Sequence, residues 1–436
     1  MGHWLLANST NGKPNDGAQK EAAARFGVSR RTVRRFWSKT KQKIQSGAAV
    51  IFTSAHKGTV HKDRKKLDVE KVKSLSILER STIRKMAVKL GVSKSLLGQL
   101  IKRKELRPHT SAIKPQLTDV NKIARMKFCL SNVVYDGAMS RYSYQSMHNV
   151  VHIDEKWFYM TKTSDRYYLL PEETDPYRAC KSKRFITKVM FMCAVTRPQF
   201  SADGQELFDG KIGIFPFTTL EATKRKSKNR AKGVLEVKPI QSITKDVIKE
   251  CIIKQVIPAI KEKWPKSDQV KHIFIQQDNA KPHFNKDDPD FQAAANSDGF
   301  NIELVCQPAN SPDVNVNDLG FFRAIQSLQD DKMAKTVEDL VQNVLISFEK
   351  LSSVTLNNVF VTLQGCLTEI MRVKGSNDYK IPHINKSRLL RMGMLPECIE
   401  LDEGLIKDSL THVMQFDVNA GTNYDIGGLI HHFGFG

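Results

Sequence analysis

Long hydrophobic runs are missing from this sequence of 436 residues. A membrane-spanning helix needs about 18 consecutive apolar residues, and no stretch of the chain approaches that length. The opening segment, MGHWLLANST, is too short and too polar to predict a secretory signal. We therefore expect no membrane partner for this protein.

Paired cysteines are missing as well. The seven cysteines are scattered, odd in number and never spaced as CxxC, which argues against a disulfide framework and against a zinc site. Scattered free thiols suit a reducing compartment. The sequence also lacks a phosphate-binding P-loop and any Ser, His and Cys pattern typical of a catalytic triad. We expect no covalent protein nucleophile.

Acidic residues are scarce relative to basic ones. The chain has 68 Lys and Arg against 46 Asp and Glu, a formal net charge of +22 and a pI near 9.6. Such an excess of positive charge favours a polyanionic partner, and without a membrane segment nucleic acid is the preferred one. The hydrophobic content of 40% is ordinary for a globular protein, and the length allows two or three domains.

A Gly-Val-Ser triplet occurs twice, at residues 27–29 and 91–93, each time between two short helical patterns. The Gly suits a left-handed turn residue, the Val can enter a core and the Ser can cap the following helix. Because the second helix is basic in both copies, we predict a paired helix-turn-helix module that binds double-stranded DNA. Little sequence precedes the first copy, so its supporting first helix should be short. The candidate DNA-contacting residues are Ser29, Arg30, Arg31, Arg34, Arg35, Ser93, Lys94, Ser95, Gln99, Lys102 and Arg103.

Three aspartates stand at the boundaries of apolar runs. Asp154 follows the strand-like run 150–153, Asp278 ends the strand-like run 271–277, and Asp318 stands where an apolar helix begins. Carboxylates that converge from separate elements repel one another unless a cation lies between them. Hard oxygen ligands suit Mg²⁺ or Mn²⁺, and two such ions about 3.5–4 Å apart support phosphodiester chemistry. We expect Asp154, Asp278 and Asp318 to be the catalytic residues and to bind two ions.

Several sequence blocks around these aspartates resemble the transposases of mariner-like elements, in particular the plant type. The blocks, in family order, are HIDEKWF, RYYLLPEE, KSKRFITKVMF, DGKIGIFPF, QQDNAKPH, NSPDVNVNDLGFF and YKIPHI, and the resemblance runs from about residue 10 to about residue 398. The plant type is marked by thirty-nine residues between the last two aspartates, as between Asp278 and Asp318. The resemblance implies an RNase H-like fold, cut-and-paste DNA transposition at TA targets, and a homodimer that pairs two ends.

Asp313 competes with Asp318 for the third position. It leaves thirty-four residues after Asp278, which is the spacing of the animal mariner branch. In the family the letters SPD precede the catalytic acid, which follows five residues later before an aromatic helix. Asp318 fills that position, so we interpret Asp313 as a residue that turns the chain.

Other residues near the aspartates have competing interpretations. Glu155 should point away from Asp154, because neighbours in an extended segment face opposite sides. Asn279 and His283 are candidate auxiliary residues, and His283 either binds phosphate, relays a proton or has a structural role. The run KRKSKNRAK (224–232) has six cations in nine residues and contacts DNA, acts as a nuclear localisation signal, or forms a solvated loop.

The predicted fold class combines an α module with an α/β domain. We expect a paired helix-turn-helix region at 1–110, a helical connector at 111–147, an RNase H-like α/β catalytic domain at 148–350 and a helical C-terminal extension and tail at 351–436. Strands are expected at 149–153, 166–170, 186–195, 271–277 and 302–306.

The sequence thus predicts a nuclear, Mg²⁺- or Mn²⁺-dependent DNA transposase that binds terminal inverted repeats, cuts there and joins the ends to target DNA. The alternative is a domesticated or inactive transposase that keeps DNA binding as a regulator. A nuclease that acts on RNA–DNA hybrids is a weaker alternative, because it leaves the two helix-turn-helix units without a role.

Overall fold

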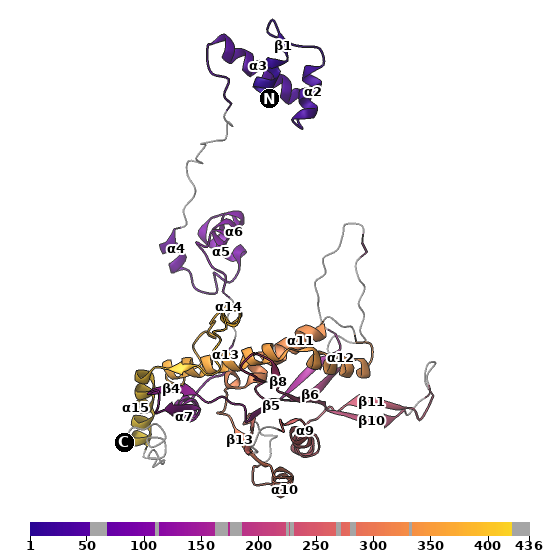
Figure 1. Cartoon of the computed structure of the whole chain (residues 1–436), viewed down its shortest axis with the longest axis vertical. Coiled ribbons are helices and arrows are strands. Elements are labelled where there is room, and N and C mark those ends of the chain that lie inside the picture. Colours follow the sequence, from indigo (N-terminus) through magenta and orange to yellow (C-terminus); the bar gives the residue numbers. More distant parts are fainter. Residues whose placement is uncertain are drawn as a thin grey trace. The chain divides into compact units, whose positions relative to one another are not determined.

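A computed structural model of the chain describes most of its residues and divides it into two compact units (Figure 1). The described residues are 1–52, 68–109, 113–161, 173–174, 185–223, 226, 231–266, 272–279, 285–330 and 334–420. The first unit spans Met1–Ser111 and the second spans Ala112–Gly436. No helix among the described residues combines the length and the hydrophobicity needed to cross a bilayer.

The first unit begins with a small helical bundle. Its elements are α1 (Gly2–Ala7), β1 (Ser9–Thr10), β2 (Lys13–Pro14), α2 (Ala18–Arg25) and α3 (Arg30–Gln45). Leu5, Ala22 and Val33 are fully buried and join the three helices in one core. Gly27 has a φ of +59°, and the Ser29 hydroxyl accepts a hydrogen bond from the N–H three residues on, so the predicted turn and cap are confirmed. The supporting first helix is present and short, as expected.

A second helical bundle repeats this arrangement. Its elements are α4 (Val69–Ser74), α5 (Ile83–Leu90) and α6 (Lys94–Lys102). Gly91 has a φ of +68°, and Ser93 caps α6 by accepting the N–H of Leu96 at 3.1 Å. Leu97 and Leu100 are almost fully buried against α5. The basic stretch 56–66, between the two bundles, lies outside the described residues.

The second unit contains a mixed five-stranded sheet with the order β13-β12-β5-β6-β9. Strand β5 pairs antiparallel with β6, and β6 pairs antiparallel with β9, whereas β12 and β13 run parallel to β5. The strands are β5 (Val150–Tyr159), β6 (Lys188–Val195), β9 (Lys211–Pro216), β12 (His272–Gln277) and β13 (Asn301–Cys306). The first of these five strands along the chain, β5, lies at the centre, with the antiparallel pair β6 and β9 on one side and the parallel pair β12 and β13 on the other. This is the topology of an RNase H-like domain, so the predicted fold class is confirmed.

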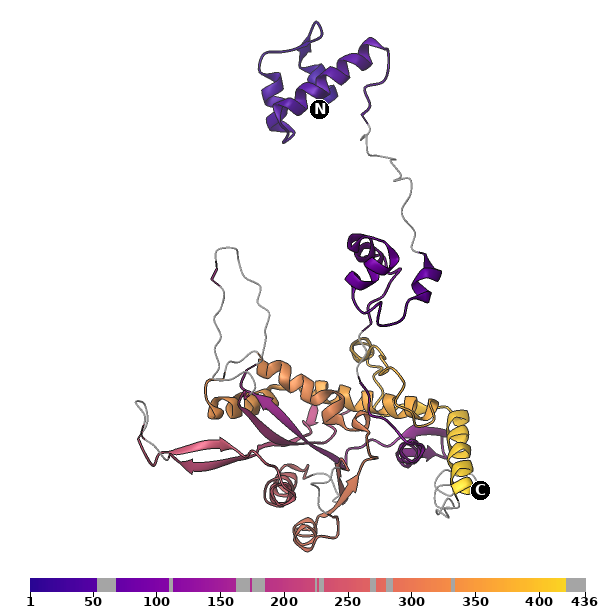
Figure 2. The ribbon, with the colours of Figure 1, turned by 180° about the vertical axis from the view of Figure 1, so that it is seen from behind.

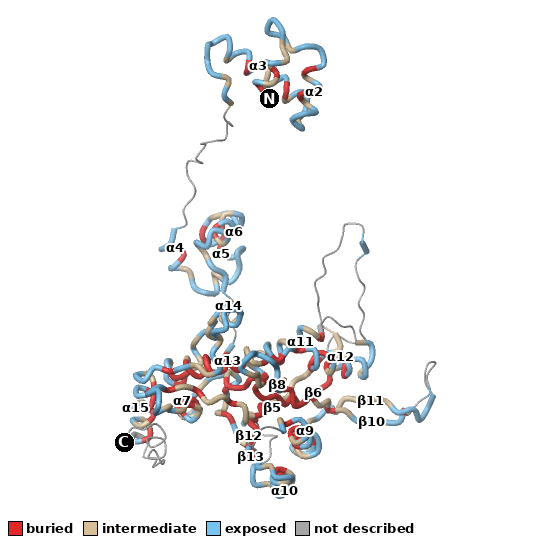
Figure 3. The backbone as a smooth tube through the Cα atoms, viewed as in Figure 1, coloured by how far each residue is buried: buried red, intermediate tan, exposed pale blue. Residues whose placement is uncertain are grey.

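Helices cover both faces of this sheet (Figures 1 and 2). One face packs on α8 (Lys245–Cys251), the π-helical segment η1 (Ile252–Val256), α9 (Ile257–Lys263) and α10 (Pro289–Ala295). The other face packs on α7 (Asp119–Ser131), the short turn η2 (Pro312–Val314), the π-helical segment η3 (Asn317–Phe321), α11 (Phe322–Asp330), α12 (Val337–Lys350), α13 (Ser353–Arg372) and α15 (Glu403–Ala420). A further helix, α14 (Lys386–Arg391), has no buried residue. Figure 3 shows the buried residues concentrated along the sheet and α13.

The segments on either side of the predicted catalytic domain join its core. A small sheet consists of β3 (Val133–Asp136), β4 (Arg141–Tyr144) and β14 (Glu400–Leu401). Met126 and Leu130 of α7 share one hydrophobic core with Leu410 and Val413 of α15. The stretch expected as a connector therefore lies within the larger unit. Thr118 and Asn121 form a capping box at the start of α7.

Several strands of the structure were not expected, and one expected strand cannot be compared with the structure. The helical segment before β12 changes from α8 through the π turns of η1 to α9, and Pro258, which lacks a backbone N–H, stands at the start of α9. The strands β1 to β4, β7 to β11 and β14 were not predicted. Among them, β9 is a strand of the central sheet, whereas four are short and have not been described above: β7 (Gln199–Phe200), β8 (Glu206–Phe208), β10 (Thr218–Ala222) and β11 (Leu235–Pro239). The strand expected at 166–170 lies outside the described residues.

Candidate active site

Asp154 lies in the middle of the central strand rather than at its end, which corrects the sequence prediction. Strand β5 continues to Tyr159 because the residues beyond Asp154 pair antiparallel with β6 along their whole length. On its other edge β5 pairs with β12 only as far as His152. Asp154 therefore lies just beyond the last residue of β5 that pairs with β12.

Asp278 is the first residue beyond β12 and lies at the level of Asp154. In the parallel register Gln276 is the partner of His152, and both aspartates lie two residues further along. Residues at equal positions on neighbouring parallel strands share a face, and the strands are about 4.8 Å apart. This face carries the core formed with α11 to α13, because His152 contacts Phe360 of α13 with ring centroids 5.4 Å apart.

Asp318 reaches the same place from η3, where its carboxyl faces that of Asp154 and its charge acts on it. Two amide side chains fix this segment on β5. Asn315 Nδ2 donates to Asp154 Oδ2 at 3.2 Å and to the carbonyl of Ile153 at 3.3 Å. Asn317 Nδ2 donates to the carbonyl of His152 at 3.1 Å. The sequence analysis missed both asparagines, although the alternation in NVND was a visible signal for them.

The electrostatics of the three carboxyl groups show that they face one another. Burial, followed by the charges of Asp318, Glu155 and Asp278, raises the pKa of Asp154 to about 9. Burial also raises the pKa of Asp318, which the charge of Asp278 reinforces and that of Lys156 opposes. Carboxylates that lie this close repel one another, and a cation between them relieves the repulsion.

The donor set fits a hard divalent cation in its chemistry. Asp154 and Asp318 offer carboxylate oxygens that already meet, and Asp278 acts on both through its charge. Within the described part of the chain, however, no three His, Cys, Asp or Glu side chains approach closely enough to hold a metal ion in this arrangement.

Asp313, the competitor for the third position, is committed to another contact. Arg125 of α7 is fully buried, and its two terminal nitrogens donate to the two carboxylate oxygens of Asp313 at 2.6 and 2.7 Å. The Tyr379 hydroxyl donates to the same carboxylate. Burial by itself would raise the pKa of Asp313, but the hydrogen bonds and charge of Arg125 lower it overall. Asp313 thus forms a structural ion pair, a role that goes beyond the turn in the chain that we expected.

The other residues near the site have different roles. Glu155 faces the opposite side of the sheet from Asp154, as predicted. On that side lies Cys251 of α8, whose pKa is raised by burial and, to a smaller extent, by the charge of Glu155. Burial lowers the pKa of His152 to about 3, so this histidine is neutral. Asn279 is exposed next to Asp278, and His283 lies outside the described residues.

Lys156 is a basic neighbour of the site that the sequence analysis did not single out. It lies two residues beyond Asp154 on the same face of β5, its ammonium is 5.3 Å from the centroid of the Phe322 ring, and its charge acts on Asp318. A cation here partly offsets the negative charge of the carboxyl groups.

The candidate DNA-contacting residues lie on the second helix of each bundle or at its start. Ser29 and Ser93 cap these helices with their hydroxyl groups. The remaining candidates are exposed: Arg30, Arg31, Arg34 and Arg35 on α3, and Lys94, Ser95, Gln99 and Lys102 on α6 with Arg103 after it. The arginines of α3 have no acidic neighbour within that helix, so their charges remain available.

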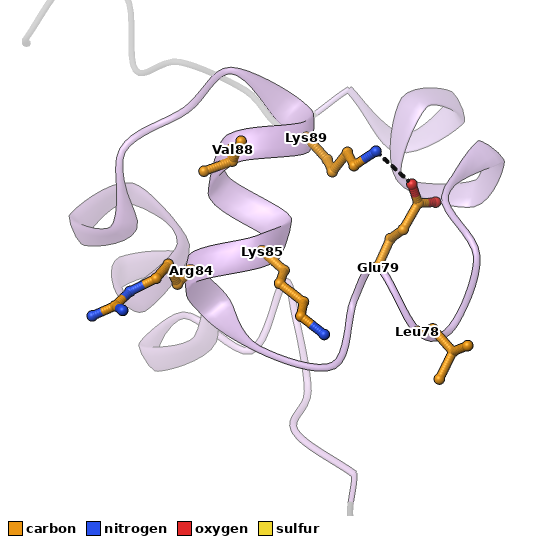
Figure 4. A pocket seen from close by; sticks show the side chains of 6 residues that line it. All are labelled: Leu78, Glu79, Arg84, Lys85, Val88 and Lys89. Atoms are coloured by element: carbon orange, nitrogen blue, oxygen red, sulfur yellow. Dashed lines mark ion pairs between the residues drawn. The ribbon is translucent and has the colours of Figure 1, made fainter.

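A pocket of about 490 Å³ lies in the second bundle and contains none of the three aspartates (Figure 4). Its lining combines apolar and basic side chains, and Lys89 pairs with Glu79 at 2.9 Å across it. The residues that line it are Leu78, Glu79, Arg84, Lys85, Val88 and Lys89. It belongs to the outer side of α5 and has no acid cluster.

Comparison with known proteins gives one family match and several similar structures. A family described as a domain of unknown function (DUF7769) matches residues 3–47. No curated protein matches the chain. A pre-cleavage Mos1 transpososome is 16% identical with a TM-score of 0.49, over 86% of this chain and 96% of that chain. The Mos1 strand transfer complex is 17% identical with a TM-score of 0.47, over 87% and 97%. The catalytic domain of Mos1 mariner transposase is 14% identical with a TM-score of 0.39, over 62% and 100%.

Proposed function

We propose that this protein is a mariner-like DNA transposase of the plant type, which binds the terminal inverted repeats of its element, cuts there and joins the ends to target DNA at TA sites. One observation carries the proposal. In an RNase H-like sheet, Asp154 and Asp278 occupy equal positions on neighbouring strands, and the segment that carries Asp318 is held at Asp154 by the amide of Asn315. The spacing of these aspartates and the sequence blocks around them match the mariner pattern.

Asp154, Asp278 and Asp318 would hold two Mg²⁺ or Mn²⁺ ions in this proposal. Such ions, when bound, activate a water molecule or a DNA 3′-hydroxyl and stabilise the leaving oxygen. The protein's own contribution is to place the carboxylates: Asn315 holds Asp154 by its amide, and Asn317 anchors η3 on β5.

The two N-terminal bundles would recognise the ends of the element. Their second helices expose basic residues, as recognition helices that enter the major groove do. Because two ends have to be joined, the functional form would be a homodimer, with double-stranded DNA as the only macromolecular substrate. A transposase of this kind acts in the nucleus, and we propose that localisation here.

Removal of positive charge from α3 tests this DNA-binding role. In the variant Arg30→Ala/Arg31→Ala/Arg34→Ala, we expect weaker binding to end DNA and a salt dependence lower by roughly 0.9 unit of slope for each lost phosphate contact. Fluorescence anisotropy at a series of salt concentrations measures both quantities. The matched variant Lys94→Ala/Lys102→Ala/Arg103→Ala tests the second bundle, and an unchanged affinity and slope in either variant removes that bundle from the interface.

A DNA-binding regulator without cleavage is the second candidate function. The observation that favours it is the third carboxylate, which does not complete a three-ligand group in the described arrangement. Incubation of the protein with duplexes that carry the ends of its element separates the two functions. We expect strand breaks in Mg²⁺ or Mn²⁺, none with a chelator, and binding without cleavage in Ca²⁺. Binding that never leads to a nick in Mg²⁺ or Mn²⁺ establishes the regulator instead.

A further inference from the structure

Strands β10 and β11 form a two-stranded ribbon that extends away from the rest of the larger unit (Figures 1 and 2). Its base is well anchored. Phe217 is buried in the core next to α8 and α9, and the backbone N–H of Val237 donates to Glu338 Oε1 of α12 at 3.1 Å. Beyond the strands, Thr223 exchanges hydrogen bonds with Gly233 and Val234, so the pairing continues outward. The ribbon is therefore a defined and anchored structural element, although two strands alone are only marginally stable in water.

The two faces of the ribbon differ in character. Directly opposed residues of an antiparallel pair share a face, so the register assigns six residues to one side and four to the other. The first face is mostly apolar and consists of Thr218, Leu220, Ala222, Leu235, Val237 and Pro239. The second face is polar and consists of Thr219, Glu221, Glu236 and Lys238.

The outer half of the apolar face is open to solvent. Leu220 is 67% exposed and Leu235 is 63% exposed, and the neighbouring Val234 is 45% exposed. Leucines with this exposure at the end of a protruding ribbon indicate a surface that is covered by a partner.

Charge decides which class of partner fits. The sequence between the strands, residues 224–232, has six cations and no acid, and the described Lys226 and Lys232 are exposed. A second copy of the same ribbon would bring like charges together, whereas a polyanion would neutralise them. The polar face suits phosphates less well, because Glu221 and Glu236 lie opposite each other and the one lysine of this face, Lys238, pairs with Glu221 at 3.1 Å. Apolar side chains do contact DNA in the minor groove, where they pack against sugars and base edges.

We propose that the β10–β11 ribbon is an additional DNA-binding arm, distinct from the two helical bundles. Its apolar outer face, Leu220, Ala222 and Leu235, lies in the minor groove of duplex DNA, and Lys226 and Lys232 contact the flanking phosphates. The inference rests on the proposed action on DNA, and it gives the larger unit a DNA-binding site of its own. Contacts of this kind read no bases, so the arm binds DNA of any sequence.

Two double variants of the full chain separate the two parts of the arm. With a random-sequence duplex in an anisotropy titration, Lys226→Ala/Lys232→Ala should lower the salt slope by about 1.8 units, because two phosphate contacts are lost. Leu220→Thr/Leu235→Thr should weaken binding roughly tenfold at fixed salt and leave the slope unchanged, since only apolar contact is removed. All four positions are exposed and threonine favours strands, so both variants should fold, which the thermal midpoint checks.

The control removes two lysines from elsewhere in the same unit. Lys254 and Lys407 are exposed and each pairs with a glutamate one helical turn away, so Lys254→Ala/Lys407→Ala should leave the slope unchanged. Ribbon variants that bind like the original chain overturn the arm. A dimer that becomes a monomer in Leu220→Thr/Leu235→Thr, at unchanged DNA affinity, also overturns it and identifies a second copy as the partner. A chain that binds no DNA at all contradicts the proposed function itself.

Discussion

Replacing Asp278 by Asn is expected to lower the rate of DNA-end cleavage by about three orders of magnitude or more, with unchanged affinity for the ends. The carboxylate would be shared by metal ions whose action on the nucleophile and leaving group amounts to several kcal/mol, and each 1.36 kcal/mol is a factor of about ten in rate. Asp278 is the most informative of the three aspartates because it is the first residue beyond β12, whose ladder with β13 ends at Gln277. Single-turnover cleavage of labelled ends, beside a binding titration, measures both effects.

The matched control for this substitution is Asp287→Asn. Asp287 is an exposed acid that follows the same loop, and only its backbone N–H enters a described hydrogen bond, to Asn285. The Asp287→Asn variant should cleave DNA ends at the rate of the original protein. Full cleavage activity in Asp278→Asn would exclude this residue from the metal ligands, and equal losses in both variants would show a general effect of charge.

Replacing Asp313 by Asn is expected to lower the free energy of unfolding by about 3–5 kcal/mol, because the fully buried Arg125 then has no counter-charge. Thermal and urea denaturation measure this loss. The same change should spare the chemistry in the molecules that remain folded, so cleavage normalised to the folded fraction should stay close to that of the original chain. Asp318→Asn should show the reverse: a nearly unchanged midpoint and a lost cleavage rate.

A surface ion pair on α7, the helix that carries Arg125, provides the control for Asp313→Asn. Asp119 pairs with Lys122 at 2.8 Å and is fully exposed at the start of α7, so Asp119→Asn should not shift the midpoint. If Asp313→Asn also leaves the midpoint unchanged, the pair with Arg125 is not a stabilising contact.

The Arg125 pair also predicts how stability depends on pH. The pKa of Asp313 lies below its ordinary value of 3.8 in the folded protein, since Arg125 outweighs the effect of burial. A lowered carboxyl pKa stabilises the fold at every pH above 3.8, and this contribution disappears as the pH falls through the folded-state value. In Asp313→Asn the acid-induced part of the loss should therefore be smaller than in the original chain.

Local patterns were sufficient for the parts of the site that lie in single elements. The buried strands at 188–195, 272–277 and 301–306 and the two Gly-Val-Ser turns were predicted correctly, because each has its apolar spacing or its turn residue in one short segment. The end of β5 was predicted wrongly because Asp154 is followed by two further charged residues, Glu155 and Lys156, which interrupt the apolar run. Only the pairing with β6 shows that this stretch is extended.

Contacts between distant segments explain what the sequence did not reveal. Arg125 and Asp313 are 188 positions apart, and no local pattern indicates that one neutralises the other. The same holds for the amides of Asn315 and Asn317, whose acceptors lie on β5 more than 160 positions earlier. The ribbon was missed because β10 and β11 are five residues each and expose their leucines, so neither has the pattern of a buried strand.

The shared core of α7 and α15 has a consequence for how the protein is made. Residues of the first unit, up to Ser111, can fold as soon as they leave the ribosome, whereas Met126 and Leu130 wait for Leu410 and Val413. At about 5–20 residues per second this delay is roughly 15–60 s. A nascent chain, or one shortened before α15, would therefore already recognise DNA ends while its nuclease half was incomplete. Premature termination would turn the gene product into a competitor of its own full-length form.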